Sequence, residues 1–71
     1  MNLDTLVRMA NQIAAFFHPY PHDEAVAQTR AHLKNFWDPR MRRELIAHVA
    51  TGGAGLSPLA LEAARTLAAE S

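Results

Sequence analysis

Apolar side chains recur at every third or fourth position through the first seventeen residues, which is the spacing of one face of an α-helix. Polar side chains such as Arg8 and Asn11 fall on the opposite face. Met9 and Phe16 are one heptad apart on the flank of the apolar face and widen it. The pattern predicts a first helix over residues 3–17, with an inner face made of Leu3, Leu6, Val7, Ala10, Ile13, Ala14 and Phe17.

A second helix is predicted after a proline-rich break. Pro19 and Pro21 end the first helix, because proline lacks an amide hydrogen and restricts the residue before it. Asp23 is predicted to cap the helix that follows. Helical spacing gives this second helix an inner face made of Val26, Thr29, Leu33, Phe36 and Trp37.

Cap signals bound the remaining helices. Asp38-Pro39 predicts an N-cap followed by proline at the first helical position, and Ser57-Pro58 repeats the pattern. Gly52-Gly53 predicts the end of the third helix, with a glycine in the left-handed conformation. The inward side chains are Met41, Leu45, Ile46 and Val49 on the third helix, and Leu59, Ala60, Ala63, Ala64 and Leu67 on the fourth. The fold class is therefore all-α, a small bundle of four short helices forming a single helical domain over 1–71.

Composition makes this bundle lean and removes several kinds of chemistry. The 71 residues are 49% hydrophobic, but 14 of the hydrophobic residues are alanines. Without cysteine the chain has no disulfide, no thiolate nucleophile and no sulfur ligand for zinc or an iron–sulfur cluster. The net charge is zero, although residues 30–43 carry a local excess of positive charge. No apolar run reaches the ~20 residues of a membrane span and the N-terminal sequence is unlike a signal peptide, so we expect a soluble, cytoplasmic protein.

The histidines and carboxylates do not predict a catalytic or metal site. His18 and His22 have the i,i+4 spacing of a helical pair, but the two prolines between them prevent the helix that would align them. His32 and His48 have no second ligand on the same turn. The glutamates are scattered, and the cap position explains Ser57. We therefore expect no catalytic residue, no metal ligand and no cofactor in this chain.

A glycine stretch, TGGAGLSP, raises the possibility of a phosphate-binding loop at a helix N-terminus. It lacks the preceding strand and the lysine of a P-loop, so it fails the test of context. The stretch is better explained as a helix end, a turn and a new cap. These structural roles fall to Gly52, Gly53, Gly55, Ser57 and Pro58.

The arginines after Pro39 point to an interaction surface. Arg40 and Arg43 share the solvent side of the predicted helix with Glu44, whereas Arg42 falls on its apolar face. Arg42 must therefore pair with Asp38 four residues earlier, stack on a neighbouring aromatic ring or meet a group of a partner. A nucleic-acid role would need more cations projecting from one helix, and the zero net charge disfavours it.

Three segments carry a resemblance to a known family: LVRMANQIAAFF at 6–17, FWDPRMR at 36–42 and HVATGGAGLSPLALEAA at 48–64. In this order and spacing they resemble the delta subunit of the soluble, NAD-dependent, molybdenum-containing formate dehydrogenases. The resemblance covers nearly the whole chain. The part between the first two blocks, HPYPHDEAVAQTRAHL, contributes little to it.

The resemblance implies a complex of several subunits. In that family the alpha subunit carries molybdenum bound to two pyranopterin guanine dinucleotides together with iron–sulfur clusters. The beta subunit holds FMN and the NAD site, and the gamma subunit holds a further cluster. The delta subunit is the small companion without a cofactor, so the resemblance implies a non-catalytic accessory subunit that supports assembly, stability and activity, with no nucleic-acid or membrane partner. A transient cofactor-insertion chaperone for the alpha subunit and, less favoured, a small helical nucleic-acid-binding module remain as alternatives.

Two surfaces are candidates for contact with the alpha subunit, and the sequence does not rank them. We expect truncation of Trp37 or Arg42 to weaken that association, because aromatic residues and arginine often dominate interface energies. Leu61 and Ala68 add apolar flank on the fourth helix. The first candidate surface is Phe36, Trp37, Asp38, Pro39, Arg40 and Arg42, and the second is Met9, Asn11, Gln12 and Phe16.

Overall fold

The computed structural model describes residues 2–70 and confirms the all-α fold class. Within these residues the regular structure is entirely helical. The four helices fall close to the predicted bounds: α1 Leu3–Phe17, α2 His22–Phe36, α3 Pro39–Ala50 and α4 Pro58–Glu70. None of these helices is both long and apolar enough to cross a membrane.

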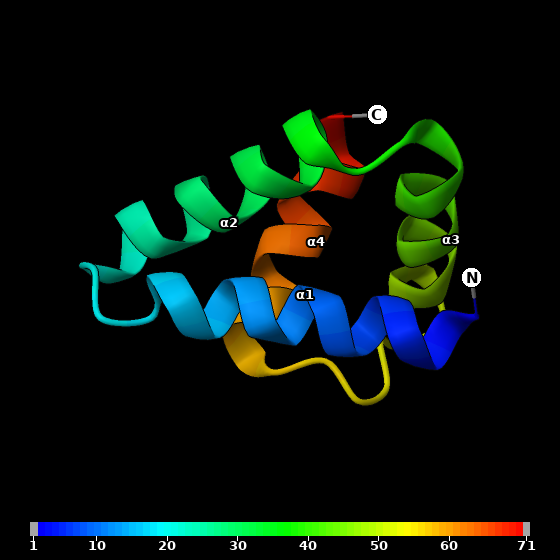
Figure 1. Ribbon diagram of the computed structural model, residues 1–71, viewed down its shortest axis with the longest axis horizontal. Helices are drawn as coiled ribbons and strands as arrows, with labels where there is room; N and C mark the ends of the chain where they lie inside the picture. The colour runs from blue at the N-terminus through cyan, green and yellow to red at the C-terminus, as the bar shows by residue number, and fades with distance from the viewer. Residues whose placement is uncertain (1, 71) are drawn as a thin grey trace.

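Helices α1 and α2 diverge from the short connection at 18–21, and α3 lies across the open end of the V that they form (Figure 1). Helix α4 lies behind this V and packs against the other three helices. Helix α1 also packs against α2 and α3. The arrangement leaves α4 as the common floor of the fold, with α1 and α2 as two arms above it.

Local signals start the helices as predicted in two cases and fail in one. The Asp38 side chain accepts the Met41 amide at 2.9 Å, with Pro39 in the first turn, and the Ser57 hydroxyl accepts the Ala60 amide at 3.2 Å. The prediction that Asp23 caps α2 is wrong. Helix α2 begins at His22 after Pro21 with no side-chain cap, and Asp23 lies in its first turn, where a carboxylate interacts favourably with the helix dipole.

Helix α3 ends in a Schellman motif, which confirms the predicted glycine stop. The Gly53 amide donates to the His48 carbonyl and the Gly52 amide to the Val49 carbonyl, each at 3.0 Å. Gly52 has φ 111° and Gly53 has φ 67°, backbone conformations that residues with a side chain rarely adopt. A Cβ on Gly53 would also lie 2.5 Å from Leu61 Cδ1, so the turn packs directly against α4.

The core is as lean as the composition suggested. Its leucines, among them Leu6, Leu33 and Leu45, are separated by small side chains that let the helices approach closely. Leu61 packs partly buried against this core, so it is not the free flank that the sequence suggested. The buried alanines are Ala10, Ala14, Ala25, Ala60, Ala63 and Ala64.

Thr29 is the polar exception in this interior. It is fully buried on α2, and its hydroxyl has no hydrogen-bond partner among residues 2–70. A buried hydroxyl without a partner has lost its hydrogen bonds to water and gained none in return, which destabilises the folded state. The predicted inward position of Thr29 is confirmed, but at a cost in stability.

Candidate functional site

Two hollows of the surface lie on nearly opposite sides of α1. One is lined on α1 by Asn11, Ala14, Ala15 and His18, and the other by Met9, Gln12, Ile13 and Phe16. Each set has the spacing i, i+3, i+4, i+7, which defines one face of a helix. We term the first the polar hollow and the second the aromatic groove.

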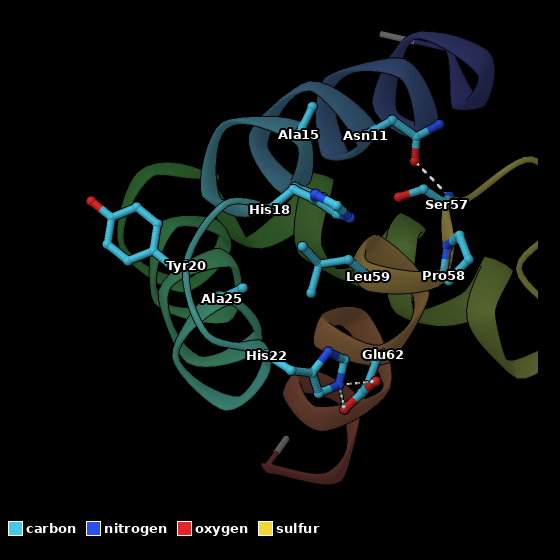
Figure 2. Close-up of a pocket in the computed structure, with 11 residues that line it drawn as sticks. Asn11, Ala15, His18, Tyr20, His22, Ala25, Ser57, Pro58, Leu59 and Glu62 are labelled. Carbon is cyan, nitrogen blue, oxygen red and sulfur yellow. Dashed lines mark hydrogen bonds and ion pairs between the residues drawn. The ribbon is translucent and has the colours of Figure 1, made fainter.

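The polar hollow lies between α1, the 18–21 connection and the first turns of α4 (Figure 2). It has a volume of about 660 Å³. His22 and Glu62 lie at one end, where His22 Nε2 is 2.9 Å and 3.1 Å from the two Glu62 carboxylate oxygens. Both side chains are about half exposed, at 64% and 50%, so water competes for this contact and it contributes little to stability.

The sequence did not anticipate the pairing of His22 with Glu62. The two residues are 40 positions apart, and only the packing of α2 on α4 brings them together. No residue group within 2–70 combines three or more histidine and carboxylate side chains in a geometry that could hold a metal ion. The Ser57 hydroxyl at the other end of the hollow is engaged as the α4 cap. The hollow thus offers an imidazole–carboxylate pair beside a hydroxyl that is already in use.

Asn11 borders this hollow as a clamp on the loop between α3 and α4. Its Nδ2 donates to the Gly55 carbonyl at 3.0 Å, and its Oδ1 accepts the Ser57 amide at 2.8 Å (Figure 2). His48 Nε2 donates to the Ala54 carbonyl at 2.7 Å and holds the same loop from α3. Asn11 was predicted as an interface residue, but the structure uses both polar ends of its side chain within the chain.

The aromatic groove joins the two surfaces that the sequence left unranked. It is formed by α1, the C-terminal half of α2 and the first turn of α3, with a volume of about 520 Å³. Met9, Gln12 and Phe16 come from one predicted surface, and Phe36 and Trp37 come from the other. Parts of the two candidate surfaces therefore meet in one groove, whereas Asn11 lines the other hollow. The role of these residues in binding a partner stays a prediction. The same holds for the exposed Pro39 and Arg40 at the start of α3.

Phe36 and Trp37, adjacent at the end of α2, were both predicted to face inward, and the structure confirms this only for Trp37. Trp37 is only 4% exposed and belongs to the core, so in the free chain its ring offers little accessible area. Phe36 was predicted to face inward but is 74% exposed. Phe16 is similarly exposed, at 70%. The accessible aromatic area of the groove therefore comes from the two phenylalanines.

Ring contacts order the exposed aromatic side chains. The His32 imidazole lies against the Phe36 ring, with centroids 4.6 Å apart and planes inclined by 32°. Phe17 meets Phe16 edge to face at 5.0 Å and lies 6.5 Å from His32. Aromatic pairs at such separations attract one another beyond their buried area. A line of rings consequently crosses from α1 to α2 at one end of the groove.

Arg42 meets neither Asp38 nor a ring. Its Nη1 donates to the Lys34 carbonyl at 3.0 Å and to the Trp37 carbonyl, both in the last turn and cap of α2. A cation there satisfies carbonyls that the helix leaves unpaired and interacts favourably with the helix dipole. The proposed Asp38–Arg42 pair is thus replaced by an arginine cap on the preceding helix, and Arg42 is a structural residue of the α2–α3 corner.

Carboxylates from elsewhere in the fold neutralise part of the basic segment. Arg30 lies 2.8 Å and Lys34 3.8 Å from the Glu70 carboxylate, and Arg40 lies 3.9 Å from Glu44. These contacts bring the local charge back towards the zero balance of the whole chain. They weaken further the interpretation of residues 30–43 as a nucleic-acid surface, which would need cations free to contact phosphates.

The fold and its surface define a small all-helical protein whose main apolar feature is an exposed groove rather than an enclosed pocket. A family model described as NADH-dependent formate dehydrogenase delta subunit, FdsD, matches residues 5–64 of the 71-residue chain. The chain belongs to this family of formate dehydrogenase subunits. All three segments that carried the resemblance lie within the matched range. No curated protein and no solved structure matches the chain.

Proposed function

We propose that this chain is a non-catalytic accessory subunit of a molybdenum-dependent, NAD-reducing formate dehydrogenase. It binds the large alpha subunit, which carries the molybdopterin cofactor, and supports assembly, stability and activity of the complex. Because the enzyme uses NAD, we place this role in the cytoplasm. The observation that carries the proposal is the family match over residues 5–64.

The chemistry of the chain supports a role without electron transfer. Iron–sulfur clusters are held mainly by cysteine thiolates, and the sequence contains no cysteine. The surface supports a role in association. Exposed aromatic side chains on a concave apolar surface are typical of protein-binding sites, and Phe16 and Phe36 border such a surface here.

The proposal is tested by purifying the complex through a tag on the alpha subunit from cells that express or lack this chain. We expect the chain to elute at a fixed ratio to the alpha subunit in the mature complex. Without it, the yield of intact complex and its formate:NAD activity should fall. Formate oxidation by the purified chain alone would contradict a non-catalytic role.

The same purification separates the proposal from the alternative of a maturation chaperone. A permanent subunit stays with alpha subunits that already contain molybdenum. A chaperone would be found only with alpha subunits that lack the cofactor and would be missing from the mature complex. The molybdenum content of the fractions that contain this chain distinguishes the two outcomes.

A further inference from the structure

We propose that the aromatic groove binds an amphipathic helix of the alpha subunit, and that carboxylates flank the apolar side of that helix. This inference rests on the proposed function, because it names the surface and the chemistry through which the accessory subunit is held.

The two rims of the groove present large apolar side chains to solvent. Phe16 projects from α1 and Phe36 from α2, and each is about three-quarters exposed although the core lies directly beneath. A phenylalanine that is buried on binding removes 150–250 Å² from water, as roughly expected for an aromatic side chain. Together with the half-buried Met9, these residues form the apolar centre of a binding surface, where the strongest contributions to affinity concentrate.

The arrangement of the groove suits a helix. On α1 its lining residues follow the spacing i, i+3, i+4, i+7 from Met9 to Phe16, a length of about 10 Å at 1.5 Å per residue. The facing side of the groove comes from the C-terminal half of α2 and the first turn of α3, so α1 on one side and α2 with α3 on the other form its two walls. The side chains on one face of a bound helix, at i, i+3 or i+4 and i+7, span the same length and could each contact the groove.

The charges at the groove define the flank of the bound helix. The residues that line it include no carboxylate. Arg8 lies one helical turn before Gln12 of the groove and before Asn11 of the polar hollow, so it stands on α1 between the two, and its exposed guanidinium has no ion pair or hydrogen bond among the residues that the structure describes. A free guanidinium at the rim favours a partner carboxylate, which it binds in a bidentate geometry.

Charge complementarity also favours the alpha subunit over a second copy of this chain. Two copies joined through the same groove would bring two Arg8 side chains to one interface without adding a carboxylate at its lining. The cationic rim is too sparse for a nucleic acid, and the apolar lining offers phosphates nothing to contact.

Cross-linking in the purified complex identifies the occupant. A photo-reactive phenylalanine analogue is placed at position 36 of the full chain, and the cross-linked peptide is determined by mass spectrometry. Position 65 serves as the control, because Arg65 is exposed on α4 and lines neither hollow. We expect position 36 to cross-link to an amphipathic, carboxylate-bearing helix of the alpha subunit and position 65 not to do so.

Variants test the energetic contribution of the groove. Phe16→Ser and Phe36→Ser should each raise the Kd for the alpha subunit about tenfold or more, as expected for residues at the centre of an interface. The control Arg65→Ser, on the exposed side of α4, should change it less than twofold. Arg8→Glu should also weaken binding, and more at low salt, while Arg65→Glu on the exposed side of α4 should not.

Each failure has its own signature. If the unmodified chain does not purify with the alpha subunit, the proposed function is overturned and the groove proposal with it. If the unmodified chain purifies with the alpha subunit but both serine variants are retained equally well, only the groove proposal is overturned. Cross-links from position 36 to a second copy of this chain, or to another class of molecule, would also overturn it. Unchanged circular dichroism melting of the variants excludes misfolding as the cause of weaker binding.

Discussion

Replacing Asn11 by alanine separates a structural role from an interface role. The Asn11 side chain accepts the Ser57 amide at 2.8 Å and donates to the Gly55 carbonyl at 3.0 Å, so it ties α1 to the loop that leads into α4. Asn11→Ala removes both hydrogen bonds. It also leaves the partly buried Ser57 amide at the start of α4 without an acceptor.

The size of the effect follows from these contacts. A hydrogen bond contributes about 1 kcal/mol net, and a buried donor left without a partner costs about 1–3 kcal/mol. We therefore expect Asn11→Ala to lower the free energy of unfolding by about 2 kcal/mol. For a chain of this length each kcal/mol shifts Tm by about 4–8 °C, so Tm should fall by about 8–16 °C.

The single tryptophan provides the assay. Trp37 is 4% exposed in the folded chain, so unfolding in urea moves its ring into water and shifts its fluorescence to longer wavelength. Asn11→Asp keeps the acceptor for the Ser57 amide but loses the donor to Gly55, and its stability should lie between that of Asn11→Ala and the original chain. Gln12→Ala, at an exposed neighbouring position, should change the free energy of unfolding by no more than about 0.5 kcal/mol. Unchanged urea and thermal midpoints for Asn11→Ala, combined with loss of the chain from the complex, would refute the clamp and restore Asn11 to the interface.

Three further substitutions probe the interior and the α2–α3 corner. Thr29→Val removes the buried hydroxyl that has no partner within residues 2–70 at nearly constant volume, so the free energy of unfolding should rise by about 1 kcal/mol in urea titrations. Trp37→Ala opens a cavity and should lower the free energy of unfolding by about 3–5 kcal/mol, which threatens the folding of so small a chain. Phe36→Ala should change the free energy of unfolding by no more than about 0.5 kcal/mol. Thermal unfolding followed by circular dichroism measures both. Arg42→Ala leaves the last carbonyls of α2 without their cation and should lower the free energy of unfolding by about 1–2 kcal/mol. Hydrogen exchange of the amides at the end of α2 should become faster.

Distinct results would contradict these expectations. A less stable Thr29→Val chain would mean that the hydroxyl has a hydrogen-bond partner in solution. Equal stability of the Trp37→Ala and Phe36→Ala chains would show that the indole is not part of the core. A stable Arg42→Ala chain with unchanged exchange at the end of α2 would remove the capping role of this arginine.

Features that depend on a few neighbouring residues were predictable from the sequence. The Asp38 and Ser57 caps, the glycine stop of α3 and the inner face of α4 all involve groups within about one helical turn. The Asp23 prediction failed on the same scale, because the helix begins one residue earlier, with Pro21 at the N-cap, and this places Asp23 inside the first turn. The three family-like segments likewise led to the family that the matched residues 5–64 establish.

The site was predictable only in part. Met9, Phe16 and Phe36 were named from the sequence, but as members of two separate surfaces, and the aromatic groove that contains them exists only because α1 and α2 diverge above α4. The partners of Arg42 and the meeting of His22 with Glu62 likewise depend on the directions in which one helix leaves another.

By itself, then, the sequence determined where the helices begin and end and which broad face of each is apolar, because backbone hydrogen bonds and helical periodicity are local. The tertiary structure decided which of two adjacent rings, Phe36 or Trp37, turns into the core, and whether Asn11 serves a partner or its own loop. Those outcomes depend on how helices cross, and a crossing is set by side chains far apart in the sequence that pack together.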